Sequence, residues 1–208
     1  MRYAAVALLI AALTTPAVRA QSPARAPTAL EVKLSSMLAG AVTFTLPAGW
    51  HVSMYINTAT NGSAEIINTE KVGDKPQARL FLSARFVPEG KTVVDVSGDT
   101  YGTKLRKVLG GTVLSDRADG QDWRTVIWTA DVHREPHLML EHFGVVDNTY
   151  ASATVVMPLG LGDVGRMKKV FEDFNAVCES LKVNGRGNFE NRVSPDIIKE
   201  QLKVNARK

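Results

Sequence analysis

Residues 123–157 read WRTVIWTADVHREPHLMLEHFGVVDNTYASATVVM, and they constrain the fold of this 208-residue chain more than any other segment. They contain three runs rich in β-branched and aromatic residues, which predict strands over residues 123–133, 137–146 and 150–157. The connections, Arg134-Glu135-Pro136 and Asp147-Asn148, are short enough for hairpins. We therefore expect an antiparallel meander at the centre of a sheet.

Shorter alternating runs before this meander extend the sheet. They predict strands at residues 42–46, 51–56, 64–68, 79–87 and 112–114, with a hairpin turn at Asn61-Gly62.

Two segments change to the period of an amphipathic helix. The first is residues 92–109, which Gly110-Gly111 ends. The second begins at its N-cap, Asp163, and carries an apolar stripe to Leu181. Cys178 lies on that stripe, where a thiol is usually a small buried hydrophobe with a raised pKa. The predicted fold class is therefore α+β, with a central antiparallel β-sheet packed between helices in an α/β/α sandwich.

Residues 1–20 have the form of a cleavable export signal. Arg2 gives a positive start, residues 4–13 are an unbroken apolar run, and small residues lead to Ala20, after which we predict cleavage. The apolar run is too short for a transmembrane anchor, and no later run is long enough for one. The single cysteine excludes an internal disulfide and CxxC redox sites. We expect a soluble protein of the bacterial periplasm or the exterior.

The remaining boundaries follow from composition. Residues 21–39 are expected to be a flexible leader with a short helix, because Leu30, Leu34, Met37 and Leu38 recur at helical spacing. Residues 40–183 form the predicted domain. Residues 184–208 are expected to be a linker and a basic tail, with a short helix that opens at Ser194-Pro195.

The net charge of +4 is unevenly distributed. Residues 182–208 hold seven basic and three acidic side chains, whereas residues 21–181 hold 16 basic and 18 acidic ones. The tail is therefore a candidate contact for an anionic surface, through Lys199, Lys203, Arg207 and Lys208; the alternative is a merely solvated tail. The ordinary charged fraction of 22% does not indicate a nucleic-acid-binding protein.

Three of the four histidines lie in residues 133–142, which suggests a metal site. On a helix His133, His137 and Glu141 would share a face, but Pro136 and the flanking strands favour a hairpin. Pairing across residues 134–136 places His133 opposite His137, leaves His142 on the other face, and separates Glu141 from His137 by about 13 Å. We therefore predict no metal and no cofactor, with His133 and His137 as weak candidates for a surface pair.

Other catalytic and ligand-binding patterns are weak. No G-x-S-x-G motif is present, and residues 160–162 precede Asp163, whose charge would repel a phosphate. Asp116, Asp119 and Asp122 lack the spacing of a calcium loop and predict a solvated turn. We therefore predict no catalytic residues.

Two tryptophans lie on the same predicted strand at an odd separation. Trp123 and Trp128 must therefore face opposite sides of the sheet. We expect one of them in the core and take Trp128 as a candidate partner contact. The alternative is that a second layer of the fold covers it.

The heptapeptide Phe44-Thr-Leu-Pro-Ala-Gly-Trp50 resembles the F-x-L-P-x-G-W opening of the PsbP-like and DcrB-like proteins. The resemblance covers roughly residues 40–182 and implies the Mog/PsbP-like fold, an antiparallel sheet between helices. It implies a non-catalytic accessory or binding role and transfers no catalytic residues. The chain departs from the lipoprotein members, because it lacks a lipid-attachment cysteine after the apolar run.

These observations predict a non-catalytic, soluble periplasmic accessory protein that acts through a protein or envelope partner. Two alternatives stay open. One is a small-ligand binder with a pocket between sheet and helix, and the other is a metal-dependent hydrolase that uses His133, His137 and Glu141.

Overall fold

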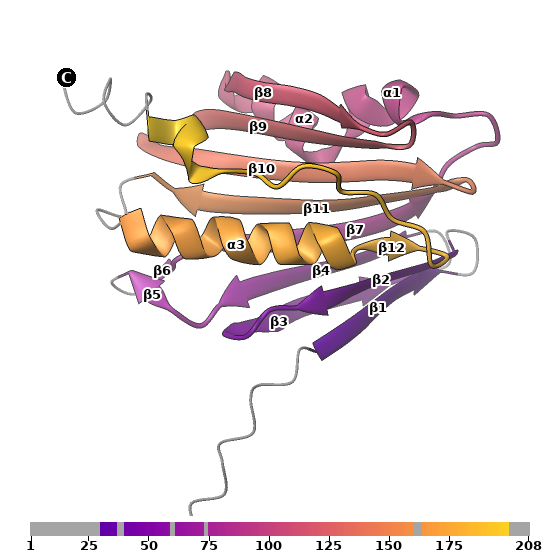
Figure 1. Ribbon diagram of the computed structural model, residues 1–208, viewed down its shortest axis with the longest axis horizontal. Helices are drawn as coiled ribbons and strands as arrows, with labels where there is room; N and C mark the ends of the chain where they lie inside the picture. The colour runs from indigo at the N-terminus through magenta and orange to yellow at the C-terminus, as the bar shows by residue number, and fades with distance from the viewer. Residues whose placement is uncertain (1–29, 37–39, 59–60, 73–74, 160–163, 200–208) are drawn as a thin grey trace, which may run out of the picture.

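The fold is built on a seven-stranded antiparallel sheet with the order β3-β4-β7-β11-β10-β9-β8 (Figure 1). The computed structural model describes residues 30–36, 40–58, 61–72, 75–159 and 164–199. The seven strands are β3 (Trp50–Asn57), β4 (Asn61–Asn68), β7 (Arg79–Phe86), β8 (Thr112–Asp119), β9 (Trp123–Val132), β10 (Glu135–Val146) and β11 (Thr149–Pro158). The predicted meander is confirmed as β9-β10-β11.

Two layers cover the faces of this sheet. Figure 1 shows α3 (Val164–Ser180) and a small sheet in front of it, made of β1 (Leu30–Ser36), β2 (Gly40–Leu46) and β12 (Lys182–Val183). Behind the upper strands lie α1 (Val93–Val96), η1 (Ser97–Asp99) and α2 (Tyr101–Leu109). The remaining elements are the β5–β6 hairpin (Lys71–Val72 and Lys75–Pro76) and η2 (Pro195–Ile198). The predicted α+β sandwich is confirmed.

The central strands are buried on both sides, which explains their nearly continuous apolar sequence. Ile127 and Leu138 belong to the hydrophobic cluster on the α3 side, and Trp128 and Met139 belong to the cluster under α1 and α2. Trp123 and Trp128 do face opposite sides of β9, as predicted. The prediction that Trp128 contacts a partner is wrong, because the α1–α2 layer buries it completely.

The β9–β10 hairpin turns earlier than predicted. Its two turn residues are His133 and Arg134, both with positive φ (53° and 68°), so Val132 pairs with Glu135 and Ala130 pairs with His137. The predicted pairing of His133 with His137 is therefore wrong. A two-residue turn with positive φ at both positions matches the right-handed twist of the two flanking strands. This match favours the two-residue turn over the predicted three-residue loop.

Two predicted helices differ in the structure. Residues 92–109 are divided into α1, η1 and α2, and Thr100 caps α2 through a 3.0 Å bond from the Thr103 N–H. Leu30–Ser36 is a strand, because it pairs with β2 along its whole length and this ladder outweighs the helical spacing. The predicted cap Asp163 lies outside the described residues. Among the described residues no helix is long and apolar enough to cross a bilayer.

Residues 184–199, the described part of the C-terminal segment, belong to the packed body. Val193 and Ile198 are buried. The side-chain amide of Asn175 on α3 accepts a 2.8 Å bond from the Val193 N–H and donates a 3.0 Å bond to the Val193 carbonyl oxygen. Ser194 caps η2 as predicted. Lys199 is exposed and pairs with Asp196 at 2.5 Å, and the other predicted tail contacts, Lys203, Arg207 and Lys208, lie outside the described residues.

The packing of Trp123 on Gly144 supplies a test of the α3-side core. A Cβ at Gly144 would overlap the indole ring and would lie 2.7 Å from the Asp122 carbonyl oxygen. We expect Gly144→Ala to lower the free energy of unfolding by about 1–3 kcal/mol, which urea titration measures. Gly98→Ala is the control, because nothing lies within 4 Å of a Cβ there. Equal urea midpoints for the two variants would contradict this packing.

Candidate functional site

The main candidate site is a groove of about 470 Å³ between α2 and the sheet. Leu105 and Leu109 of α2 form one wall. The floor includes Met139 of β10 and Val156 of β11. The groove exists because α2 has only nine residues and packs mainly on β9, so it does not cover the whole sheet face.

The groove continues toward the part of the sheet formed by β3, β4 and β7. Phe81 and Tyr101 contact each other with ring centroids 5.4 Å apart, and both line the groove and a smaller hollow of about 150 Å³ beyond it. Met54 and Ser63 line that hollow. The contact between these two rings therefore divides one furrow into a large and a small compartment.

Strand register gives the groove an apolar floor and a polar mouth. Met139 pairs with Val156, and the next pair toward the β9–β10 turn on the same face is His137 with Pro158. His133 in the turn also lines this mouth. The His137 Nδ1 lies 2.8 Å from the Glu135 carbonyl oxygen, so it donates that bond and Nε2 is left for another partner.

The structure brings His133 and His137 to one mouth, but it does not bring Glu141 to them. Glu141 is buried on the same sheet face, where its Oε1 accepts a 3.1 Å bond from the Gly102 N–H of α2. His142 lies on the opposite face of the sheet, against Trp123. Within the described part of the chain, no group of three or more His, Cys, Asp or Glu side chains is arranged to hold a metal.

Glu141 holds the helix that walls the groove. Its carboxylate receives hydrogen bonds from Thr100 and Gly102 at the start of α2, where the helix dipole favours a negative charge. Position 102 must be glycine, because a Cβ there would overlap the carboxylate. Burial raises the pKa of Glu141 to about 7, although those two hydrogen bonds and Arg106 act in the other direction.

A second polar cluster lies on the α3 side of the sheet, and sequence reasoning missed it. Asp119 and His142 are fully buried. The Thr125 hydroxyl donates to the Asp119 carboxylate, and its oxygen lies 2.9 Å from the His142 Nδ1, so the imidazole donates to it. The Arg117 Nε lies 3.3 Å from Asp119 Oδ1. The predicted solvated turn is therefore wrong for Asp119.

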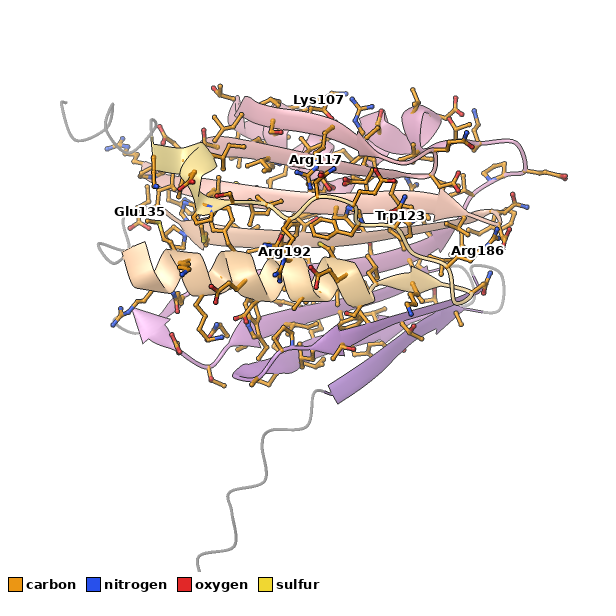
Figure 2. All side chains as sticks on the ribbon, viewed as in Figure 1. Lys107, Arg117, Trp123, Glu135, Arg186 and Arg192 are labelled. Carbon is orange, nitrogen blue, oxygen red and sulfur yellow. The ribbon has the colours of Figure 1, made fainter. Side chains whose placement is uncertain are left out.

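The described part of the C-terminal segment, residues 184–199, covers this cluster. Phe189 packs edge-on against His142 (5.0 Å between centroids), and Arg117 donates to the Asn191 carbonyl. Figure 2 shows Arg117 and Trp123 beside this segment, on the face that carries α3. Burial opposes ionisation of Asp119, but the nearby His142 imidazole, the bond from Thr125 and the charge of Arg117 hold its pKa below the usual value.

Burial also decides the state of two other groups on this side. It lowers the pKa of His142, although the contact with Asp119 opposes the change. It raises the pKa of the Cys178 thiol well above its usual value, which confirms the prediction of a buried structural cysteine.

Comparison with known proteins supports the fold. No protein-family profile matches the sequence, and no curated protein matches it either. The structure is similar to that of the cyanobacterial PsbP (CyanoP) from Synechocystis sp. PCC 6803, with a TM-score of 0.52, 16% identity, and coverage of 74% of this chain and 93% of that one. The chain has the PsbP-like fold. It is also similar to LpqN, involved in cell envelope biogenesis of Mycobacterium tuberculosis, with a TM-score of 0.51, 9% identity, and coverage of 74% and 90%.

The motif that suggested this PsbP-like fold has a physical role in it. Phe44 and Leu46 of β2 are buried, and Gly49 turns the chain with a φ of 84°. Trp50 then enters β3, and its indole N–H donates a 2.8 Å bond to Asp173 of α3. The motif therefore joins the small sheet, the large sheet and α3 at one point.

Replacement of Glu141 tests how α2 is held on the PsbP-like sheet. Because its folded pKa is raised, Glu141 contributes stability that is present below its unfolded pKa and is lost as pH rises to about 7, a change of roughly 3 kcal/mol. Glu141→Gln keeps the acceptor for Gly102 and cannot ionise. Thermal unfolding should show the variant gaining stability relative to the parent between pH 4.5 and pH 8. A constant difference across this range would contradict the assignment.

Replacement of Asp119 tests the second cluster. Asp119→Ala leaves Thr125 without its acceptor and Arg117 without its ion-pair partner, so we expect a loss of about 3 kcal/mol in unfolding free energy. The C-terminal segment should also become sensitive to limited proteolysis before the rest unfolds. Asp131→Ala on the exposed end of β9 is the control, and equal proteolysis of both variants would contradict the proposed closure.

Proposed function

We propose that this chain is an exported, non-catalytic accessory protein that binds an envelope partner in the groove between α2 and the sheet. The observation that carries the proposal is the groove itself, with its apolar floor and its polar mouth. Its volume of about 470 Å³ lies in the range of sites that enclose most of a bound group.

The chemistry of the groove suits binding of an apolar group. Leu105, Leu109 and Val156 line the groove and are only partly buried, so a bound apolar group would remove more of their surface from water. His133 and His137 at the mouth offer hydrogen bonds that orient the bound group. Arg79 also lines the groove, but it is already paired with Glu65 at 3.0 Å.

Three described groups with raised or lowered pKa values, Glu141, His142 and Cys178, are buried in structural contacts, which supports a non-catalytic role. Glu141 holds the start of α2, and His142 is enclosed by Trp123 and Phe189. Cys178 is buried in the α3-side core. A hydrolase built on His133, His137 and Glu141 has no support here, because the Glu141 carboxylate is directed to the α2 backbone.

Two observations support the proposal that the chain acts in the cell envelope. The predicted export signal in residues 1–20 supports a location outside the cytoplasm for the mature chain. LpqN, one of the two similar structures, is involved in cell envelope biogenesis. We also propose that Lys199, Lys203, Arg207 and Lys208 meet an anionic surface, a contact that should weaken with salt.

A small-molecule ligand is the second candidate occupant. The observation that favours it is the ring contact of Phe81 and Tyr101 between the two compartments, because a compartment of limited size suits a small molecule. Native mass spectrometry of protein purified from its own host distinguishes this candidate, because a bound molecule adds a discrete mass.

Filling the groove tests the proposed function. Leu105→Trp places a large ring in the groove, whereas Val108→Trp places it on the outer side of the same helix, where Val108 is 82% exposed. With immobilised protein and detergent-solubilised native envelope, we expect the parent and Val108→Trp to retain the same partner and Leu105→Trp to lose at least about tenfold in affinity. Equal retention by all three proteins would overturn the groove as the binding site.

A further inference from the structure

We infer that the small hollow beyond the Phe81–Tyr101 contact binds a neutral, polyhydroxylated ring of the kind found in monosaccharides and cyclitols. The hollow is a separate compartment from the groove, and the inference does not depend on the proposed function. It rests on a row of hydroxyl side chains, on one buried hydroxyl without a partner, and on the charges of the lining residues.

Three serines lie side by side on the floor of the hollow. Ser63 of β4 pairs with Ser83 of β7, and Ser83 pairs with Ser152 of β11. The Oγ atoms of Ser83 and Ser152 are 2.8 Å apart, and either hydroxyl can donate that bond. The hydroxyl that accepts it keeps its own hydrogen for a further partner. The row therefore offers both donors and acceptors to a bound molecule.

Thr154 adds a buried hydroxyl without a partner. It follows Ser152 by two residues on β11, so both side chains are on the same face of the sheet, and it lines the hollow. Thr154 is only 1% exposed, and its Oγ1 has no hydrogen-bond partner among the described residues. A buried hydroxyl without a partner destabilises a protein. A hydroxyl of a bound ring would supply that partner and remove the cost.

The size and the walls of the hollow suit one six-membered ring. Its volume is about 150 Å³, and a cavity of this order accommodates a benzene ring. Phe81 and Tyr101 form an apolar wall on which the C–H groups of a saturated ring can pack. Met54 and Tyr101 are 50% and 47% exposed, so the hollow opens to solvent and a ligand can enter it.

The lining residues favour a neutral ligand over a charged or a purely apolar one. Glu65 is the only charged side chain among the described residues that line the hollow, and its carboxylate is paired with Arg79 at 3.0 Å. A carboxylate or phosphate ligand would therefore meet a negative charge and no unpaired cation. A hydrocarbon ligand would leave the serine and threonine hydroxyls without partners. Ligand hydroxyls, which both donate and accept, match this floor.

Titration of the full mature chain with two neutral probes tests the inference. In isothermal titration calorimetry we expect D-glucose, myo-inositol or both to bind saturably at millimolar concentrations. The probe that binds identifies a monosaccharide or a cyclitol as the source of the ring. Glucose 6-phosphate should bind no more tightly than the neutral probes, because Glu65 lines the hollow. Saturable binding of neither neutral probe, or tighter binding of glucose 6-phosphate than of both, would overturn the inference.

Thr154→Val tests the site without disrupting the fold. Valine has nearly the same shape and the lost hydroxyl has no described partner, so the melting temperature should stay the same or rise. The affinity for the bound probe should fall at least tenfold. Thr112→Val is the matched control, because Thr112 is exposed on β8 at the other end of the sheet, and it should leave the affinity unchanged.

Two results with these variants would contradict the site. A lower melting temperature for Thr154→Val would assign its hydroxyl a structural role, and equal probe affinities of Thr154→Val and Thr112→Val would place the bound ring elsewhere. Neither result bears on the groove, which the Leu105→Trp comparison tests separately, because Leu105 lines the groove and Thr154 lines the hollow.

Discussion

The burial of β9, β10 and β11 on both faces is the constraint on which the rest of this structure depends. A sheet with two buried faces needs two apolar layers, and the chain supplies α3 with the small sheet on one side and α1 with α2 on the other. Burying a polar group between these layers costs free energy unless the protein supplies a partner, because water is excluded. The position of each buried carboxylate and imidazole follows from this requirement.

Two polar groups, Glu141 and His142, show how this requirement links the sheet to its covering layers. Glu141 faces the α2 side and satisfies backbone groups at the start of that helix, so its burial and the position of α2 depend on each other. His142, the next residue, faces the α3 side and belongs to the cluster that Asp119 organises. Adjacent residues of one strand therefore attach two different layers to the same sheet. Neither group is free for chemistry in a groove.

The candidate groove arises where the α1–α2 layer ends. The helix α2 is too short to cover the sheet face, so Met139 and Val156 remain as the floor of a groove with His133 and His137 at its mouth. This PsbP-like fold thus leaves a concave surface between α2 and the sheet.

The sequence by itself determined the antiparallel meander, the α3 stripe with Cys178, the opposite facing of Trp123 and Trp128, and the motif from Phe44 to Trp50. These features depend on local periodicity, which adjacent residues encode. Tertiary structure decided the rest. The strand at Leu30–Ser36 depends on pairing with β2, the burial of Trp128 depends on α2, and the register of His137 depends on a turn whose twist matches two strands. The Asp119 cluster joins β8, β9, β10 and the C-terminal segment, so no local pattern could reveal it, because its energy comes from contacts between residues up to 74 positions apart.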